Sequence, residues 1–335
     1  MIFQSTFSKG VGLLIAFILL GVSMGLSIVL GYTDTSIADA VTAFTSDNTQ
    51  NNTYIVIKDH RLPRALIASS VGASLGIAGL FMQALTRNPL ASPGIFGVNA
   101  GASFFVVIVV SSFQTISISS LSWVSFLGAG FAAGLVYFVG VLGREGLTPV
   151  RLTLAGAAIA GLFSSMTQGV LVLNEKALDE VLFWLAGSVQ GRSMENLFDI
   201  FPYLLVAWIL SLFLSRHINV LTMGEDVATG LGQRTGWIKA LAGLIIVLLA
   251  GGSVAIAGPI GFVGIVVPHF ARNLVGYDQR WLVPYTAALG AILLLVADIS
   301  ARFVIMPEEV PVGIMTAVIG TPLFIHIARK GLKTA

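Results

Sequence analysis

Few residues of this chain have the type and spacing that chemistry requires. There is no cysteine, and the four histidines are scattered without a pair at metal-ligand spacing. No Gly-x-x-x-x-Gly-Lys-Ser/Thr loop for binding nucleotide phosphates occurs, and no Ser/His or carboxylate pair suggests an intramembrane enzyme. We therefore expect no catalytic residues, no metal site and no cofactor.

Asp298 and Arg302 are the ionisable residues whose spacing is most informative. They lie four positions apart in an apolar run, so a helix would place them on one face, where a buried pair offsets the desolvation of each partner. No lone carboxylate stands at mid-span, as a proton- or sodium-coupled carrier would normally require. An ion-coupled secondary transporter remains the alternative to the function developed below.

The composition places these residues in a membrane. Hydrophobic residues make up 56% of the chain and charged residues 10%, whereas a soluble domain carries roughly 25% charged residues. The net charge of +2 is spread over apolar segments and forms no basic face, so we expect lipid as a neighbour and no nucleic acid.

About ten segments are long and apolar enough to cross a bilayer, which makes the chain an all-α polytopic membrane protein with a single transmembrane domain over residues 1–335. The apolar run after Lys9 is too long for a signal peptide and is predicted to be an uncleaved first span. Gly258-Pro259 is the only helix-breaking sequence between the seventh and eighth spans. The predicted spans are 11–31, 65–84, 95–112, 121–142, 152–173, 197–215, 238–257, 259–275, 281–304 and 311–328.

Basic residues predict the orientation of these spans. With both termini inside, twelve of the 18 Lys and Arg residues fall on the cytoplasmic side, as the positive-inside rule requires. The other six are Lys58, Arg61, Arg64, Lys176, Arg192 and Arg302.

Loops and small residues supply further expectations. Segments 32–64 and 174–196 are the long external connections, and the first is polar enough to predict an exposed loop. Segment 216–236, between the sixth and seventh spans, is amphipathic and could present short helices to a cytoplasmic partner. Glycines within the spans predict close helix packing, although some could line a pathway instead. They include Gly72, Gly76, Gly79, Gly128, Gly130, Gly134, Gly156 and Gly161.

Several motifs, in order from about residue 58 to the C-terminus, resemble the iron-siderophore and vitamin B12 permeases of ATP-binding cassette (ABC) importers. They are His60-Arg-Leu-Pro-Arg64, Met82-Gln-Ala-Leu-Thr-Arg-Asn-Pro-Leu-Ala-Ser-Pro-Gly94, Met223-Gly-Glu225, Gly258-Pro-Ile-Gly-Phe-Val-Gly264, Val267-Pro-His269, Ala297-Asp298 with Ala301-Arg302, and Glu309-Val-Pro-Val-Gly313.

The resemblance implies a ten-helix, type II importer permease in the bacterial cytoplasmic membrane that dimerises with an identical or paralogous copy. It implies two cytoplasmic ATP-binding subunits, an extracytoplasmic substrate-binding protein, and a ferric siderophore or related chelate as cargo. In such permeases external arginines pair with glutamates of the binding protein, and Arg61, Arg64 and Arg302 match those positions.

The resemblance also implies two cytoplasmic sites. The ATPase subunits would contact Gly224, Glu225, Ala228, Leu231 and Gly232. Thr148 and Pro149, at the inner end of the fifth span, correspond to the region of the cytoplasmic gate, and Pro149 departs from the family pattern there. Haem and cobalamin remain open as cargoes, because small and apolar residues along a pathway encode little chemistry.

Overall fold

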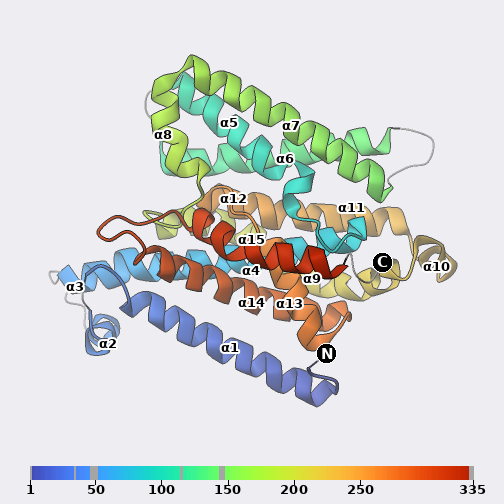
Figure 1. Ribbon diagram of the computed structural model, residues 1–335, viewed down its shortest axis with the longest axis horizontal. Coiled ribbons are helices and arrows are strands. Elements are labelled where there is room, and N and C mark those ends of the chain that lie inside the picture. Colours follow the sequence, from blue (N-terminus) through green and yellow to red (C-terminus); the bar gives the residue numbers. More distant parts are fainter. Residues whose placement is uncertain (1, 34, 46–51, 114–115, 143–147, 332–335) are drawn as a thin grey trace.

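The computed structural model describes residues 2–33, 35–45, 52–113, 116–142 and 148–331, and nearly all regular secondary structure in this part of the chain is helical (Figure 1). Its α-helices are α1 Thr6–Val29, α2 Ile37–Thr45, α3 Asn52–Ile55, α4 Leu62–Thr86, α5 Val98–Ser112, α6 Ile118–Val141, α7 Pro149–Leu173, α8 Glu175–Leu185, α9 Met194–Thr222, α10 Glu225–Gly230, α11 Thr235–Ile246, α12 Gly252–Ala257, α13 Val263–Val275, α14 Gln279–Ala301 and α15 Val312–Gly331. Shorter turns connect some of them: π-helical Val56–Arg61 and Val247–Gly251, and 3-10 Pro93–Phe96.

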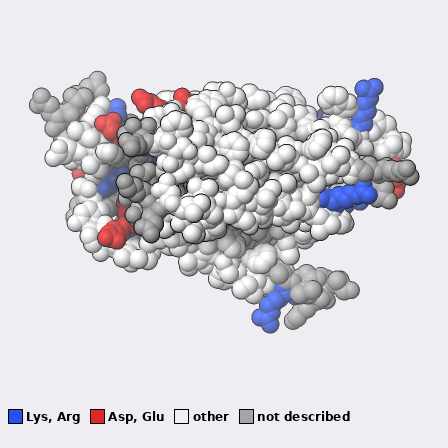
Figure 2. Space-filling model, turned by 90° about the horizontal axis from the view of Figure 1, so that it is seen from above, with Lys and Arg blue, Asp and Glu red and all other residues white. Residues whose placement is uncertain are grey.

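The ten predicted spans are confirmed. Among the described residues, seven helical segments are long and apolar enough to cross a membrane, and three shorter apolar helices, α5, α13 and α15, complete the set. Most of the face shown in Figure 2 is free of charged side chains, which lie mainly towards its two ends. Such an uncharged band is what a surface in contact with hydrocarbon requires.

The two ends of the bundle can be told apart. Both termini and α10 lie in the same half of the long axis, and α2 and α3 lie at the opposite end (Figure 1). The distribution of Lys and Arg predicts that the α10 end is cytoplasmic. We call it the inner end, and the α3 end the outer end.

Helix α4 occupies the centre of the bundle, and small residues allow its neighbours to approach. Gly72 and Gly76 lie against the backbone of α14 at Gly290 and Thr286, and Gly79 lies against the backbone of α13. A Cβ at any of the three would overlap a backbone carbonyl. The prediction of close packing through glycine is therefore correct for this stripe, since helices in lipid associate by close backbone approach.

The other predicted packing glycines fall into two groups. A Cβ added at Gly128 or Gly156 would also meet the backbone of a neighbouring segment. A Cβ added at Gly130, Gly134 or Gly161 would have no atom of another segment within 4 Å, so these three do not serve close packing within the chain.

The external segment 32–64 is partly helical, and residues 46–51, in the polar stretch on which the prediction of an exposed loop rests, lie outside the described residues. Its described part contains helix α2, and the chain is helical from Asn52 through the π turn directly into α4. Ile57 and Arg61 are buried there, because this extension packs against α1 and α4 rather than standing in water. Most residues of 36–45 are exposed, as the polar composition predicts, whereas the helices of this segment were not predicted.

Candidate docking and coupling sites

Arg64, Asp298 and Arg302 form a charged cluster at the outer end of the bundle. Arg64 on α4 donates through Nε to both Asp298 carboxylate oxygens at 3.0 Å, and through Nη2 to Oδ1 at 2.8 Å. Arg302 donates to the other side of the same carboxylate. The predicted Asp298–Arg302 pair is therefore confirmed. Asp298 is fully buried, and its carboxylate pairs with the guanidinium groups of both Arg64 and Arg302.

Further bonds extend this cluster to α1 and to the connection between α14 and α15. Arg64 Nη1 donates to Glu309 Oε2 at 2.6 Å. Arg302 Nη1 donates to the carbonyls of Ser27 and Leu30, each at 2.7 Å, at the outer end of α1. The cluster thus ties the outer ends of α1, α4 and α14 together.

Arg61 lies beside this cluster and is held by the chain that follows α1. Its guanidinium donates to the carbonyls of Val29 at 2.7 Å and Thr33 at 2.6 Å, and also to Thr35. The structure thus brings Arg61, Arg64 and Arg302 together; Arg61 and Arg302 are buried and Arg64 is partly buried, and all three have acceptors inside the chain. Sequence reasoning missed these acceptors, because most of them are backbone carbonyls or lie more than 200 residues away along the chain.

A polar cavity of about 260 Å³ opens at this end of the protein. Arg61, Arg64 and Arg302 line it, together with Glu309 and a fourth arginine, Arg192, from the connection between α8 and α9. Four guanidinium groups against one carboxylate make the lining suited to an acidic ligand.

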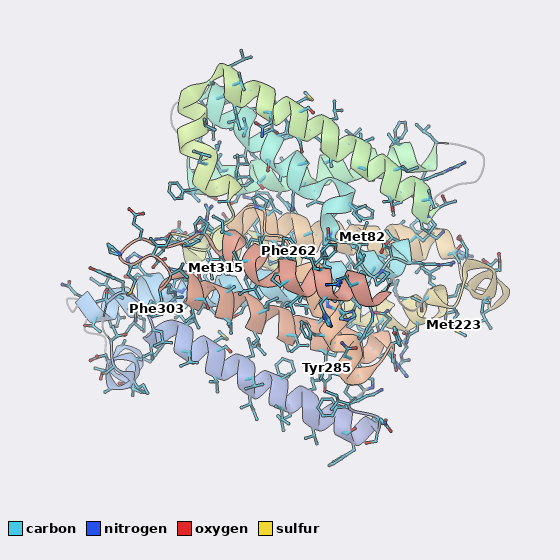
Figure 3. The ribbon with its side chains drawn as sticks, in the orientation of Figure 1. Met82, Met223, Phe262, Tyr285, Phe303 and Met315 are labelled. Carbon is cyan, nitrogen blue, oxygen red and sulfur yellow. The ribbon has the colours of Figure 1, made fainter. Side chains whose placement is uncertain are left out.

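At the inner end, α10 forms a short helix between two glycines. Gly224 precedes it at φ +130° and Gly232 follows it at φ +80°. Residues other than glycine rarely adopt these backbone conformations. Ala228 is fully buried under the helix, whereas Leu231 is two-thirds exposed. Met223, also exposed, marks this end in Figure 3, opposite Phe303 at the outer end. The predicted short helix in segment 216–236 is therefore present.

Glu225 fixes α10 to the next span. Its Oε1 accepts a bond from Lys239 Nζ on α11 at 2.7 Å and another from Thr235 Oγ1 at 3.3 Å. The bond from Lys239 holds the pKa of the Glu225 carboxyl below its usual value, and the bond from Thr235 acts in the same direction. The carboxylate is therefore charged at neutral pH and anchors the short helix.

A second connection joins the inner end of α9 to the start of α14. Asn219 donates to Asp278 Oδ1 at 2.7 Å and accepts from the backbone of Gln279 at 2.8 Å. Asp278 caps α14, and its bonds, chiefly from Arg280 and then from Asn219, lower the pKa of its carboxyl to about 2. Movement of α9 at this end would therefore be transmitted to α14.

Thr148 and Pro149 begin helix α7. The Thr148 hydroxyl accepts from the backbone of Arg151 at 3.3 Å, and Pro149 takes the first helical position, where its missing N–H costs no bond. The departure from the family pattern at Pro149 is thus compatible with a regular helix start.

Helix α7 also exposes polar side chains within its span. Ser164, Ser165 and Gln168 lie on its exposed face together with Gly161. Lipid solvates hydroxyl and amide groups poorly, so this face suits water or another protein. The serine pair with glutamine three residues later was a readable signal that the sequence reasoning did not use.

Comparison with known proteins gives consistent matches. The model of the FecCD transport family matches residues 17–330. The chain is 57% identical to a probable siderophore transport system permease, YfiZ of Bacillus subtilis (strain 168), over 99% of this chain and 100% of that protein. It is 46% identical to the Fe(3+)-citrate import system permease YfmD of the same organism, over 95% and 94%.

A solved structure matches as well. It is described as an inward-facing conformation of a metal-chelate type ABC transporter. It superposes with a TM-score of 0.83 at 30% identity, covering 96% of this chain and 99% of the other.

Proposed function

The chain belongs to the FecCD transport family, and from this membership we propose that its cargo is a ferric siderophore or ferric citrate. It is a multi-pass permease of a bacterial ABC importer and is not itself catalytic. The observation that carries the cargo proposal is full-length identity of 57% and 46% to permeases named for siderophore and ferric citrate transport. We take residues 1–335 as one transmembrane domain with its coupling loop at 216–236.

Uptake by proteoliposomes that contain the purified importer tests this proposal. A panel of labelled ferric hydroxamate, catecholate and citrate, with haem and cobalamin as comparisons, would be offered with and without ATP. ATP-dependent uptake of one ferric chelate is the expected result. Uptake of haem or cobalamin alone would overturn the cargo, and uptake driven by an ion gradient without ATP would favour the carrier alternative.

Two cytoplasmic ATP-binding subunits would drive the importer by pushing on α10. Gly224 and Gly232 bound a short helix that presents the exposed Leu231, and Ala228 packs it onto the bundle. Glu225–Lys239 and Asn219–Asp278 would carry a push on this helix to α11 and α14. A rigid-body tilt of these spans is the two-state change that alternating access needs, with ATP binding as the differential ligand.

An extracytoplasmic binding protein would dock at the outer end, over Arg61, Arg64 and Arg302. These arginines line an open cavity, which supports contact with carboxylates of that protein. Their present bonds are all within the chain, so docking would exchange internal acceptors for those of the partner. Charge reversal at Arg61 and Arg64, rescued by reversal of the partner's carboxylates, would test the contact, and absence of rescue would contradict it.

A second permease subunit, identical or paralogous, would face α7. The polar residues Ser164, Ser165 and Gln168 on its exposed face support a water-filled translocation path between the two copies. Thr148 and Pro149 would then lie at the cytoplasmic mouth of that path, as the gate region.

The absence of native cysteine gives this arrangement a clean test. Ser165→Cys should react with a water-soluble maleimide, because thiolate forms only where water reaches. Leu127→Cys, on the exposed apolar side of α6, serves as the control and should stay unlabelled. Equal labelling of the two, or none at Ser165→Cys, would contradict a path along α7.

A further inference from the structure

Arg192 is the one arginine of the outer cavity that makes no bond to another described residue. It lies in the connection between α8 and α9 and lines the cavity with Arg61, Arg64, Arg302 and Glu309. Its Nε is buried without a hydrogen-bond partner among the described residues. Burial lowers the pKa of the Arg192 guanidinium below its usual value, and no neighbouring carboxylate raises it.

The other three arginines are already engaged. Arg61 donates to backbone and hydroxyl oxygens after α1, and Arg64 donates to Asp298 and Glu309. Arg302 donates through both terminal nitrogens, although its Nε is also buried without a partner. Arg61 and Arg64 each make four hydrogen bonds inside the chain. The guanidinium of Arg192 makes none with a described residue, so all of its N–H groups can donate to an entering carboxylate.

The backbone holds Arg192 at the cavity in a defined position. Gly191 precedes it at φ +69°, and α9 begins after it with a reciprocal capping box between Ser193 and Asn196. Upstream, Ser188 donates to the carbonyl of Ala257 at 2.7 Å, and the carbonyl of Gly187 accepts from Gly313 at 2.9 Å. Anchoring on both sides reduces the entropy that a binding event must overcome.

An unpaired guanidinium in a partly buried site is costly, and such groups are normally paired. We infer that Arg192 is a docking residue of this permease, which receives a side-chain carboxylate of the extracytoplasmic binding protein in the outer cavity. The inference rests on the proposed docking at the outer end and adds a contact that neither the sequence motifs nor the three matched arginines supply. Because Arg192 gives up no internal bond, it would contribute more net affinity than a neighbour that exchanges one carboxylate for another.

The test measures the affinity of the purified binding protein for the complete importer in nanodiscs, at several salt concentrations. Arg192→Gln should weaken docking about tenfold, consistent with loss of a charge-assisted pair. Arg192→Lys should keep part of the affinity. Lys58→Gln removes a cation from the same side outside the cavity, where Lys58 lies over Phe44 and Tyr54, and should leave docking unchanged.

Two further readouts separate docking from a structural role. The thermal stability of Arg192→Gln should equal or exceed that of the unmodified importer, because no described residue loses a partner and a costly unpaired charge is removed. Cargo-free and cargo-loaded binding protein should be affected alike. An effect confined to the loaded form would assign the ligand to the cargo and overturn the inference, as would lost stability with unchanged docking.

Arg64→Gln in the same assay distinguishes this inference from the proposed function beneath it. Weakened docking of Arg64→Gln with unaltered docking of Arg192→Gln would leave the docking surface in place and overturn the role of Arg192. Unaltered docking in both variants would overturn the docking surface itself.

Discussion

Arg64 on α4 and Asp298 on α14 are joined at 2.8 Å across a separation of 234 residues in the sequence. The pair closes the outer end of two helices that are packed backbone to backbone below it, at Gly72 against Gly290. Asp298 binds Arg302 as well, and Arg64 also binds Glu309. The cluster is therefore a structural junction in addition to the proposed docking site, and the two roles make different predictions.

Removing the central carboxylate tests the structural role. Asp298→Asn should lower the free energy of unfolding by about 3 kcal/mol, because it leaves two buried guanidinium groups with less compensation. Thermal unfolding of the purified importer in detergent measures this loss. Glu308→Gln, a carboxylate-to-amide change at an exposed position nearby, is the control and should have no effect. Equal stability of the two variants would show that the Asp298 carboxylate does not stabilise the fold through this cluster.

Glu309 tests the docking role, because it already occupies Arg64 at 2.6 Å in the free permease. A partner carboxylate must compete with it, so Glu309→Gln should strengthen docking of the binding protein by about fivefold, or ~1 kcal/mol. The affinity of the binding protein for the importer in nanodiscs is the measurement. Glu308→Gln again provides the matched control. Weaker docking of Glu309→Gln would mean that Glu309 supports the docking surface instead of competing for it.

The sequence predicted what local pattern determines. Ten apolar stretches gave ten spans, and the i, i+4 spacing of Asp298 and Arg302 gave a true pair, because both follow from helix geometry alone. Family motifs led to the short helix at Glu225 and to the arginines at the outer end.

Contacts between distant segments were not predictable in this way. The acceptors of Arg61 lie at the end of α1, and Glu309 reaches Arg64 across 245 residues, so no spacing rule connects them. Segment 32–64 was predicted from its polarity to be an exposed loop. Its described part is largely helical, which polarity alone did not predict, although most of residues 36–45 are exposed as expected.

The glycine stripe of α4 predicts a sharp difference between two small substitutions. Gly72→Ala should destabilise the importer by more than ~2 kcal/mol, because the new methyl group meets the backbone of Gly290 and neither helix can yield cheaply. Gly21→Ala on α1 faces open space and should be neutral or slightly stabilising, since alanine has the higher helix propensity. Thermal unfolding of both variants checks this. Similar stabilities would mean that α4 and α14 can separate without loss.

A comparison of Glu225 with its neighbour Asp226 distinguishes the anchoring of α10 to α11 from the effect of a negative charge alone. Glu225→Gln weakens the bond to Lys239 and should lower the uptake of cargo per ATP hydrolysed several-fold, since α10 then moves without carrying α11 with it. Asp226→Asn removes the same charge one residue on, at an exposed side chain, and should transport normally. Parallel measurements of ATPase rate and uptake in proteoliposomes decide the matter. Equal coupling in the two variants would exclude the Glu225–Lys239 bond as a transmission element.

The pH dependence of stability tests the connection between α9 and α14. Bonds from Arg280 and Asn219 depress the pKa of Asp278 from 3.8 to about 2, so its stabilising contribution is complete above pH 4 and is lost as the pH falls through about 2. Because Arg280 is largely exposed and the site is screened, this contribution should be on the order of 1 kcal/mol.

Asp278→Asn keeps a capping side chain but removes the charge, so it isolates that contribution. The difference in thermal stability between the unmodified importer and Asp278→Asn should stay constant from pH 7 to about pH 4. It should then shrink as the carboxyl protonates towards pH 2. A difference that does not change with pH would mean that Asp278 has an ordinary pKa, and one that already disappears between pH 6 and pH 5 would mean that its pKa is raised. The hydrogen bonds from Arg280 and Asn219 would then not stabilise the Asp278 carboxylate, and the Asn219–Asp278 bond could not be a strong link between α9 and α14.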